Sequence, residues 1–430
     1  MTPRPPTLAL VTLLVWMGSQ AARAAEPASA PLLGPAELVG EVLARADDRL
    51  ALMPAVAAAK WVQHQPVGDP ARESVVTQAA GDRAAELGLV REPVVAVFAL
   101  QVRLARAAQE ALFAGWQRGE AFDQQAPVES LAGELRPWLD RLTAEFTAAL
   151  YLATPMLSDP DAIPHFAAVA RERLPAPRWS VADRAELLTA LSAVRYSAPR
   201  SLDRARRSHV LRIGTPADYA PFSVEAGGRV TGADVALTLR LAAALGLRPV
   251  FVRSSWRTLL ADLEADRFDI AVGGISVTPA RLAVAAFSLP TAHGGKTAVG
   301  RCADRSRLAT LAAIDQPSVR VIENVGGTNE AFAHEALHAA SLRIHPDNRS
   351  VFDEIVAGRA DVMFTDDTEV ALATHRHPEL CRLLAELYAP ADKAILLPRD
   401  PSWATAVNEW LAPEIDRGTP ARLLAEELAR

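Results

Sequence analysis

The chain has 430 residues, of which 50% are hydrophobic, so it is long enough for two or three domains with their own cores. It carries 45 basic and 51 acidic side chains, for a formal net charge of -6 at pH 7. Proteins that bind nucleic acid concentrate basic residues, so this balance excludes nucleic acid as an expected partner.

The first 25 residues have the pattern of a secretory signal peptide. A positive start at 1–4 precedes an apolar run at 8–17 and the small-residue sequence Ala22-Arg23-Ala24. The apolar run is too short for a bilayer, and no later stretch reaches the ~18 apolar residues of a membrane helix. We therefore expect cleavage near Ala24 and an exported, soluble protein without a membrane partner.

Residues 26–197 are predicted to form an all-α domain. Apolar residues recur at helical spacing over 36–52, 54–63, 70–87, 93–116, 128–152 and 181–196. Asp69 followed by Pro70 has the pattern of an N-cap and a first helical position. Strand signals are almost absent here, so we expect a helical bundle.

Residues 209–430 show short buried strands that alternate with helices. We expect strands at 210–214, 249–253, 269–273, 296–300, 319–323 and 361–364, and helices at 234–245 and 256–265. Such alternation is typical of an α/β sheet domain. The polar, basic run 198–208 is interpreted as a linker, and the predicted fold class is an all-α bundle followed by an α/β domain.

Two polar motifs in the α/β half indicate a site for a small acidic molecule. The sequence GGTNE at 326–330 resembles a glycine turn that opens a helix, where backbone N–H groups and the helix dipole favour a carboxylate. Asp366, Asp367 and Glu369 place three carboxylates within four positions after an apolar strand. Because such close charges do not all ionise easily, we predict that one stays protonated and acts as an acid.

The chain contains two cysteines, Cys302 and Cys381, which lie 79 residues apart. An even count in an exported chain favours a disulfide, whereas two free buried thiols are the alternative. In the chain-entropy model a bridge over such a loop contributes roughly 4 kcal/mol.

Three runs of the α/β half resemble the periplasmic amino-acid-binding proteins, which have two lobes that close about a hinge. They are DYAPF at 218–222, GGISVTPAR at 273–281 and GGTNE at 326–330. The resemblance implies one lobe at about 209–299 and 391–430 and a second at about 300–390. It also implies that Arg281 clamps the ligand carboxylate with help from Ser276, Thr278 and Thr328, and that Asp366 holds a ligand amino group.

Further runs are similar to a catalytic offshoot of that family, the cyclohexadienyl (prephenate or arogenate) dehydratases. They are SW at 255–256, GKT at 295–297, HPDN at 345–348, HPELC at 377–381 and LPRD at 397–400. The offshoot also has the glutamate at Glu369, the lysine at Lys296 and both cysteines, which strengthens the expectation of a disulfide. The resemblance implies conversion of prephenate to phenylpyruvate, with arogenate to phenylalanine as a parallel activity.

That reaction expels a ring hydroxyl while a ring carboxylate departs as CO2, and a carboxylic acid can deliver the required proton. We assign the acid to Glu369, while Lys296 would hold one carboxylate or stabilise developing charge. The remaining substrate contacts would come from Tyr219, Trp256, Ser276, Thr278, Arg281, Thr328, Asn329 and Asp366.

Taken alone, these residues have simpler interpretations. Glu369 would be a solvated residue in the first turn of a helix, Lys296 a surface charge and Trp256 a packing residue. The sequence also departs from the family at Asp367 and Thr368, where small or apolar residues are expected, and at 233–236, where a more acidic pattern is expected. These departures bear on which substrate is bound more than on the type of reaction.

The helical half carries sparse cations. Arg49 lies eleven residues before Lys60, close to three helical turns, so both can share one face. Arg72 lies in a first helical turn, where a positive charge opposes the dipole. Gln109 lies among alanine and leucine residues in mid-helix. Taken one at a time, the three cations would be interpreted as solvent-exposed side chains, and Gln109 as a polar residue at the edge of an apolar helix face.

The runs MPAVAAAKW at 53–61, PV at 66–67, RE at 72–73 and F-x2-Q-x7-Q at 98–109 resemble the secreted, all-helical chorismate mutases. The resemblance implies that Arg49 and Arg72 grip two substrate carboxylates and that Lys60 and Gln109 address the ether oxygen. Arg136 would supply a last cation from a later helix. Such a rearrangement requires orientation and charge stabilisation, and no cofactor or metal.

The two resemblances fit together, because the product of the first reaction is the substrate of the second. We therefore expect a periplasmic bifunctional enzyme of phenylalanine synthesis that acts on chorismate, prephenate and, as an option, arogenate. A homo-oligomer is one option for its assembly. The alternative is a solute-binding protein for an amino acid or aromatic acid with an inactive helical domain.

Overall fold

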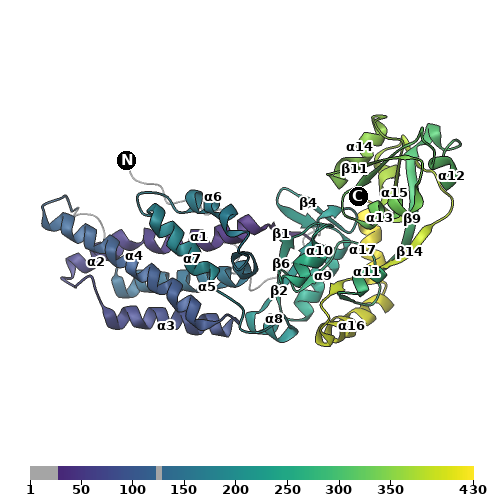
Figure 1. Cartoon of the computed structure of the whole chain (residues 1–430). Coiled ribbons are helices and arrows are strands. Elements are labelled where there is room, and N and C mark those ends of the chain that lie inside the picture. The colour runs from purple at the N-terminus through teal and green to yellow at the C-terminus, as the bar shows by residue number, and fades with distance from the viewer. Residues whose placement is uncertain (1–27, 123–127) are drawn as a thin grey trace.

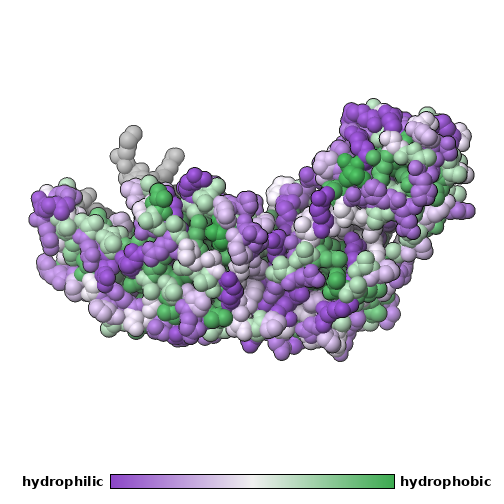
Figure 2. All heavy atoms as spheres, viewed as in Figure 1, coloured by the Kyte–Doolittle hydropathy of each residue, from purple (hydrophilic) through white to green (hydrophobic). Residues whose placement is uncertain are grey.

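The computed structural model describes residues 28–122 and 128–430, and the predicted signal peptide at 1–25 lies outside this part of the chain. Figure 1 shows a helical domain, a first α/β lobe and a second α/β lobe, which follow one another along an elongated molecule. Hydrophilic side chains cover much of the face seen in Figure 2, with apolar atoms in scattered patches. No helix among the described residues is long and apolar enough to cross a membrane.

The helical domain packs its apolar helix faces around one core that includes Leu43, Phe98, Phe146 and Leu150. Asp69 is the predicted N-cap, and its side chain accepts a hydrogen bond from Arg72 N at 3.0 Å. The helix α6 was not predicted, because prolines interrupt the pattern there and one of them occupies its first turn. The elements are α1 (Pro35–Ala51), α2 (Met53–Val62), α3 (Pro70–Glu86), α4 (Arg91–Gln117), a π-helical turn (Leu131–Leu135), α5 (Arg136–Leu157), α6 (Ile163–Arg173) and α7 (Val181–Ser192).

Lobe 1 is built on a sheet with strand order β3-β4-β5-β1-β6-β2-β7-β15-β8. Parallel strands β6, β2 and β7 form its buried centre, as expected for an α/β domain. Its elements are β2 (Val210–Thr215), β3 (Asp218–Tyr219), β4 (Ser223–Ala226), β5 (Arg229–Thr231), α9 (Ala233–Ala244), β6 (Arg248–Arg253), α10 (Leu259–Glu264), β7 (Ile270–Ala271), α11 (Pro279–Leu282), β8 (Ala286–Phe287), β15 (Leu396–Leu397), α16 (Pro401–Asp416) and α17 (Thr419–Leu428).

Lobe 2 is built on a second sheet with order β11-β10-β12-β9-β13, and β14 also pairs with β9. Because β9 already belongs to this sheet from Ala292, lobe 1 ends near residue 291 rather than 299, and the chain returns to lobe 1 after Lys393. The elements are β9 (Ala292–Arg301), α12 (Leu311–Ile314), β10 (Arg320–Asn324), α13 (Thr328–Ala336), β11 (Ser341–His345), α14 (Val351–Val356), β12 (Val362–Asp366), α15 (Asp367–Arg376), β13 (Leu380–Arg382) and β14 (Tyr388–Lys393).

The domain boundary before the helices differs from the expected one. Residues of β1 (Ala30–Leu33), which precede the helical domain, pair with β5 on one side and β6 on the other. Without β1 the facing edges of β5 and β6 would have unpaired backbone groups, which are costly when buried. The helical domain is therefore an insertion after the first strand of the lobe 1 sheet.

The expected linker at 198–208 is an ordered, buried connection. It contains α8 (Leu202–Ser208), in which Leu202 is 2% exposed and Arg204 is 0% exposed. Two of its arginines, Arg200 and Arg204, pair with Asp266 of lobe 1. The run therefore fixes the two domains together rather than separating them.

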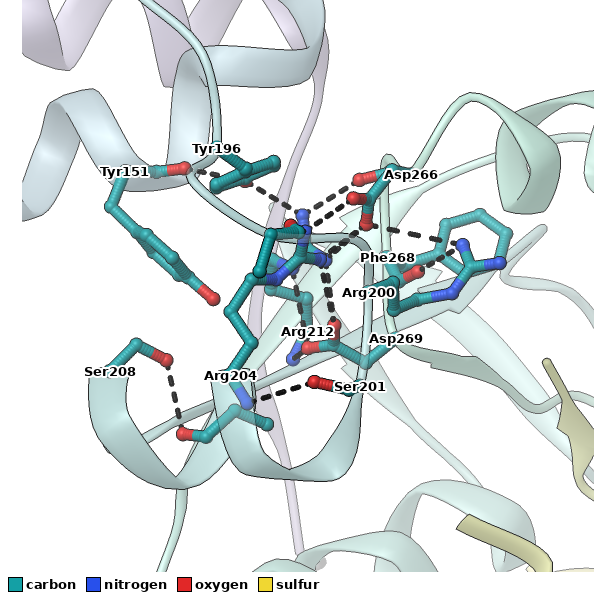
Figure 3. A network of polar contacts seen from close by, with 12 residues as sticks. Tyr151, Tyr196, Arg200, Ser201, Arg204, Ser208, Arg212, Asp266, Phe268 and Asp269 are labelled. Atoms are coloured by element: carbon teal, nitrogen blue, oxygen red, sulfur yellow. Dashed lines mark hydrogen bonds and ion pairs between the residues drawn. The ribbon is translucent and has the colours of Figure 1, made fainter. Parts of the chain in front are cut away.

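A buried ionic network joins the helical domain to lobe 1 (Figure 3). Arg212 on β2 contacts Asp269 at 2.6 Å and Asp266 at 2.7 Å, and it donates to the Tyr196 hydroxyl at 2.8 Å. Arg204 binds the same Asp266 carboxylate through two nitrogens, each at 2.5 Å. Such bidentate pairs fix geometry as well as charge.

Apolar packing continues across the same junction. Val210 on β2 and Val250 and Val252 on β6 belong to the core cluster of the helical domain, while Leu211 and Phe251 on the same strands belong to the core of lobe 1. The helical domain and lobe 1 therefore share a hydrophobic interface in addition to the ionic network.

The predicted disulfide is present between Cys302 and Cys381, with an S–S distance of 1.96 Å. Strand pairing brings the two cysteines together. Cys381 on β13 lies opposite Gly300 on the neighbouring strand β9, two residues before Cys302. The bridge closes a loop with a sequence separation of 79, which contains most of lobe 2.

Replacing both cysteines by serine is expected to lower the free energy of unfolding by about 4 kcal/mol, because the unfolded chain regains the entropy of an open loop. Urea unfolding of the oxidised wild type and the double variant measures the difference. An unchanged midpoint would contradict a stabilising role for the bridge.

Replacing Arg212 by methionine is expected to lower the free energy of unfolding by about 3–5 kcal/mol, because Asp269 would be left as a buried charge without this partner. The matched control is Arg206→Met, since Arg206 lies on α8 just before β2 but is exposed and contacts Asp203 at 3.7 Å. The control should change stability by no more than about 0.5 kcal/mol. Equal losses in both variants would rule out a special role for the buried network.

Candidate active sites in the cleft and in the helical domain

A cleft between the two lobes gathers side chains from the ends of several strands. Tyr219 of lobe 1 donates from its hydroxyl to Asp366 of lobe 2 at 2.5 Å, and Asn348 of lobe 2 donates to the Asp218 carbonyl at 3.0 Å. These contacts hold the lobes against each other. The lining residues are Tyr219, Trp256, Gly274, Ser276, Arg281, Asn324, Gly327, Thr328, Asn329, Asn348, Asp366, Glu369 and Lys393.

Eight of the residues expected to contact substrate in this half therefore lie together, and two do not line the cleft. Thr278 is the N-cap of α11, where its side chain accepts from Arg281 N at 3.3 Å. Lys296 lies behind the lining and donates to Asp366 at 2.9 Å. Thr278 thus positions Arg281 locally, and Lys296 acts on the cleft through Asp366.

Asp366 at the end of β12 is the ionic centre of the cleft and is only 4% exposed. Lys296 approaches one carboxylate oxygen at 2.9 Å, while Lys393 and Tyr219 approach the other at 2.5 Å each. Burial alone would raise the pKa of Asp366, but the nearby Lys393 and Lys296 ammonium groups hold it well below its usual range. Asp366 is therefore ionised, and each of its carboxylate oxygens accepts at least one hydrogen bond.

Glu369 behaves in the opposite way. It lies in the first turn of α15 with 5% exposure, and burial raises its pKa to about 8, with a further contribution from the Asp366 charge. The Thr365 hydroxyl donates to one of its oxygens and opposes the shift. At neutral pH Glu369 is mainly a neutral carboxylic acid, which excludes the interpretation as a solvated helix residue.

The raised pKa of Glu369 agrees with the prediction that one carboxylate stays protonated, but its main cause is burial rather than the crowding of charges that we expected. Burial is the largest cause of the shift at Glu369, and Asp366 rather than Asp367 is the carboxylate that contributes most to it. The Asp367 carboxylate instead accepts from Gly295 N at 3.3 Å, outside the cleft lining. Crowding by Asp367 therefore does not explain the acid.

A cationic and aromatic corner faces these carboxyl groups. Arg281 donates from one terminal nitrogen to the Ser276 carbonyl at 2.8 Å, and its guanidinium lies 5.8 Å from the Trp256 ring centre. Burial lowers the pKa of Arg281 to about 10, so it remains charged at neutral pH. Thr328 begins α13, whose first N–H groups add a partial positive charge. The corner can bind a carboxylate.

A rigid loop supports the aromatic wall. Gly274 has φ +69° and lies so close to the rings that an added Cβ would come within 2.7 Å of Tyr219 and 2.6 Å of Phe222. Asp234 of α9 accepts from Gly273 N at 3.0 Å and Gly274 N at 2.7 Å. The glycine is therefore required by both backbone conformation and space.

Lys393 is the charged cleft residue that was not predicted from the sequence, and the lining residues Asn324 and Asn348 were not predicted as substrate contacts either. Lys393 lies at the end of β14, is 2% exposed, and donates to Asp366 at 2.5 Å and to the Ser276 hydroxyl at 2.8 Å. Burial lowers its pKa to about 8. One signal was available: the chain contains three lysines among 45 basic residues, and the other two, Lys60 and Lys296, had already been assigned to sites.

A second pocket lies within the helical domain. All the residues predicted for this half line it, although they come from different helices, and Gln101 and Arg106 line it as well. Arg49 and Lys60 come from α1 and α2, Arg72 from α3, Gln109 from α4 and Arg136 from α5. Tertiary packing therefore brings together cations that are up to 87 residues apart.

The pocket cations are partly desolvated. Burial lowers the pKa of Arg49 to about 10, and its guanidinium donates to the Leu139 carbonyl at 3.0 Å. Burial also lowers the pKa of Lys60, which donates to the Val67 carbonyl at 2.6 Å. Arg72 makes a loose contact with Asp140 at 3.5 Å.

Two buried amides complete this pocket. Gln109 donates to the Ala105 carbonyl at 3.1 Å and to the Met53 sulfur at 3.3 Å, but its own carbonyl oxygen has no partner among the described residues. Gln101 is 1% exposed, and neither its nitrogen nor its oxygen has a partner in the described part of the chain. Buried polar groups without partners are uncommon, so both amides are available to a polar ligand.

The sequence profile described as bacterial extracellular solute-binding proteins, family 3, matches residues 211–426. The cyclohexadienyl dehydratase of Pseudomonas aeruginosa is 45% identical over 228 residues, which cover 52% of this chain and 85% of that protein. The L-cystine-binding protein of Escherichia coli K12 is 21% identical over 235 residues, or 54% of this chain and 88% of that protein.

Among solved structures, an amino acid ABC transporter substrate-binding protein from Streptococcus pneumoniae has a TM-score of 0.50 and 20% identity, covering 53% of this chain and 98% of that one. At this identity the likeness concerns the fold, and it agrees with the two-lobed architecture. Through residues 211–426, this chain belongs to the bacterial extracellular solute-binding proteins, family 3.

Proposed function

We propose that the cleft is the active site of a prephenate dehydratase and that the helical pocket is the site of a chorismate mutase. One observation carries the dehydratase: Glu369 is a buried carboxylic acid in the cleft lining, and burial raises its pKa to about 8. The 45% identity with a cyclohexadienyl dehydratase supports the same activity.

The cleft has suitable partners for an anionic ring. Arg281 uses one nitrogen on Ser276 and keeps other N–H groups for a substrate carboxylate. Thr328 and the first N–H groups of α13 would assist the same carboxylate. Tyr219 and Trp256, with ring centres 5.9 Å apart, would bound the substrate ring.

In the proposed step, Glu369 protonates the ring hydroxyl, which leaves as water. The bond between the ring and its carboxylate breaks, CO2 departs, and the electron pair of that bond enters the ring, which becomes aromatic. Glu369 is left as a carboxylate and regains a proton from solvent. Its burial disfavours the charged form, which makes it an effective donor at neutral pH.

The helical pocket is assigned to the preceding reaction because it gathers several cations and buried amides that a dicarboxylate ether would need. Arg49 and Arg72 would bind the two carboxylates of chorismate in its compact form, with Arg136 as a further cation. Lys60 would donate to the ether oxygen as its bond breaks and a carbon–carbon bond forms, and Gln109 would do so once its amide nitrogen leaves Ala105 and Met53. Orientation can supply about 7–11 kcal/mol of such a barrier, and one donor about 3–4 kcal/mol.

The two activities form a sequence, since prephenate leaves the first site as product and enters the second as substrate. The signal-like start and the match to extracellular solute-binding proteins support an exported, periplasmic enzyme. The competing candidate is a solute-binding protein with an inactive helical domain, which the family match also allows.

One time course separates these candidates. The mature protein is given chorismate, and substrate and products are followed by chromatography. Phenylpyruvate supports both activities, and prephenate alone leaves the cleft as a binding site. If added prephenate reacts but chorismate does not, the mutase is rejected, and if neither reacts, a binding protein is the better description.

Glu369→Gln is expected to lower the dehydratase kcat by roughly 10²–10⁴-fold and to cause prephenate to accumulate, because the amide cannot donate an acidic proton. In the wild type, kcat should fall as the pH rises through about 8, where Glu369 loses its proton. Steady-state rates between pH 6 and pH 10 test both statements.

Asp367→Asn is the matched control, since Asp367 lies two positions earlier on α15 but outside the cleft lining. Its rate and pH profile should stay close to those of the wild type. A wild-type rate in Glu369→Gln would remove Glu369 from the acid role.

Lys60→Ala is expected to lower mutase kcat by roughly 10²–10³-fold without changing dehydratase turnover of added prephenate. Arg103→Ala serves as control, because Arg103 lies on α4 outside the pocket lining and pairs with Glu186 at 2.5 Å. Following chorismate absorbance gives the mutase rate directly. Similar mutase rates in both variants would refute the assignment.

A further inference from the structure

The cleft contains a carboxylate in a position suited to a ligand ammonium group, but that carboxylate is already neutralised. Asp366 receives Lys296 on one oxygen at 2.9 Å, and Lys393 and the Tyr219 hydroxyl on the other at 2.5 Å each. Three donors therefore occupy most of the lone pairs of this 4% exposed carboxylate.

Lys393 is held in place by more than its charge. Its ammonium group also donates to the Ser276 hydroxyl at 2.8 Å and lies 5.4 Å from the Tyr219 ring centre. An incoming ammonium group would have to displace this ammonium group, or approach Asp366 beside two like charges in a desolvated site. Both routes are unfavourable because like charges repel strongly where water is excluded.

Among the described lining residues of the cleft, no other ionised carboxylate replaces Asp366, and the unpartnered Oδ1 of Asn348 is a neutral acceptor. Glu369 is the remaining acidic residue in the lining, and its carboxyl group is neutral at neutral pH and accepts from Thr365. Arg281 and Lys393, together with Lys296 behind the lining, outnumber the one ionised carboxylate, so the site has a positive excess. A positive excess suits a doubly anionic ligand.

We propose that Lys393, by neutralising Asp366, selects doubly anionic 2-oxo acids over ligands that carry an α-ammonium group. This inference rests on the proposed dehydratase and specifies its substrate: prephenate, with a 2-oxo acid side chain, is preferred to arogenate, with a 2-amino acid side chain. In the same way, the cleft does not capture ordinary amino acids.

The test compares kcat/KM for prephenate and arogenate in the full-length mature protein, with phenylpyruvate and phenylalanine as the measured products. The wild type should prefer prephenate by at least ~10-fold. Lys393→Met should reduce this preference by ~10-fold or more, because Asp366 is then able to accept an ammonium group. Lys393→Arg keeps the positive charge and is the matched control, which should retain most of the preference.

The possible outcomes separate the inference from the function on which it rests. If the wild type converts neither substrate, the dehydratase itself is rejected. If it converts both with equal kcat/KM, or if Lys393→Met keeps the full preference, the dehydratase stands and the role of Lys393 is overturned.

A binding measurement covers the case in which Lys393→Met does not fold, as judged by circular dichroism. Inhibition constants of the wild type are then measured for phenylpyruvate and L-phenylalanine, which differ in the same oxo and ammonium groups. Phenylpyruvate should inhibit at ~10-fold lower concentration. Equal or tighter inhibition by L-phenylalanine would overturn the inference.

Discussion

The ionised carboxylate of Asp366 is the contact on which the cleft depends. It joins β12 to β9 through Lys296, to β14 through Lys393 and to lobe 1 through Tyr219. A buried charge is tolerated only when partners neutralise it, so these side chains are held in one arrangement. Because both ammonium groups are directed at Asp366, burial dominates at Glu369, which remains protonated. One ion cluster therefore sets the charge of the site and the state of its acid.

Lobe 1 is the frame that both candidate sites share. The strand β1 enters its sheet before the helical domain begins, and α8 and the Arg212 network fix the chain where that domain ends. Lobe 2, by contrast, is linked to lobe 1 through the neighbouring strands β9 and β14 and through contacts across the cleft. Lobe 1 and the helical domain are therefore joined more extensively to each other than lobe 1 is to lobe 2.

The two candidate sites use buried cations in different ways. In the helical pocket Arg49 and Lys60 donate only to backbone carbonyls or a hydroxyl, so their charge is available to an anionic ligand. In the cleft Lys296 and Lys393 are paired with an internal carboxylate, and Arg281 is the cation left for the ligand. This contrast is consistent with a site that orients a dianion and a site that also delivers a proton.

The sequence by itself determined the local features, because short-range physics controls them. Neighbouring residues predicted four such features. They are the Asp69 cap, the glycine turn before α13, the alternation of strands and helices, and the position of Glu369 after a buried strand. The motifs also indicated the solute-binding family and most of the cleft residues. Tertiary structure alone decided the long-range features, since they arise from contacts between distant segments. These are the insertion of β1 between β5 and β6, the burial that keeps Glu369 protonated, and the pairing of Lys393 with Asp366, which no local pattern encodes.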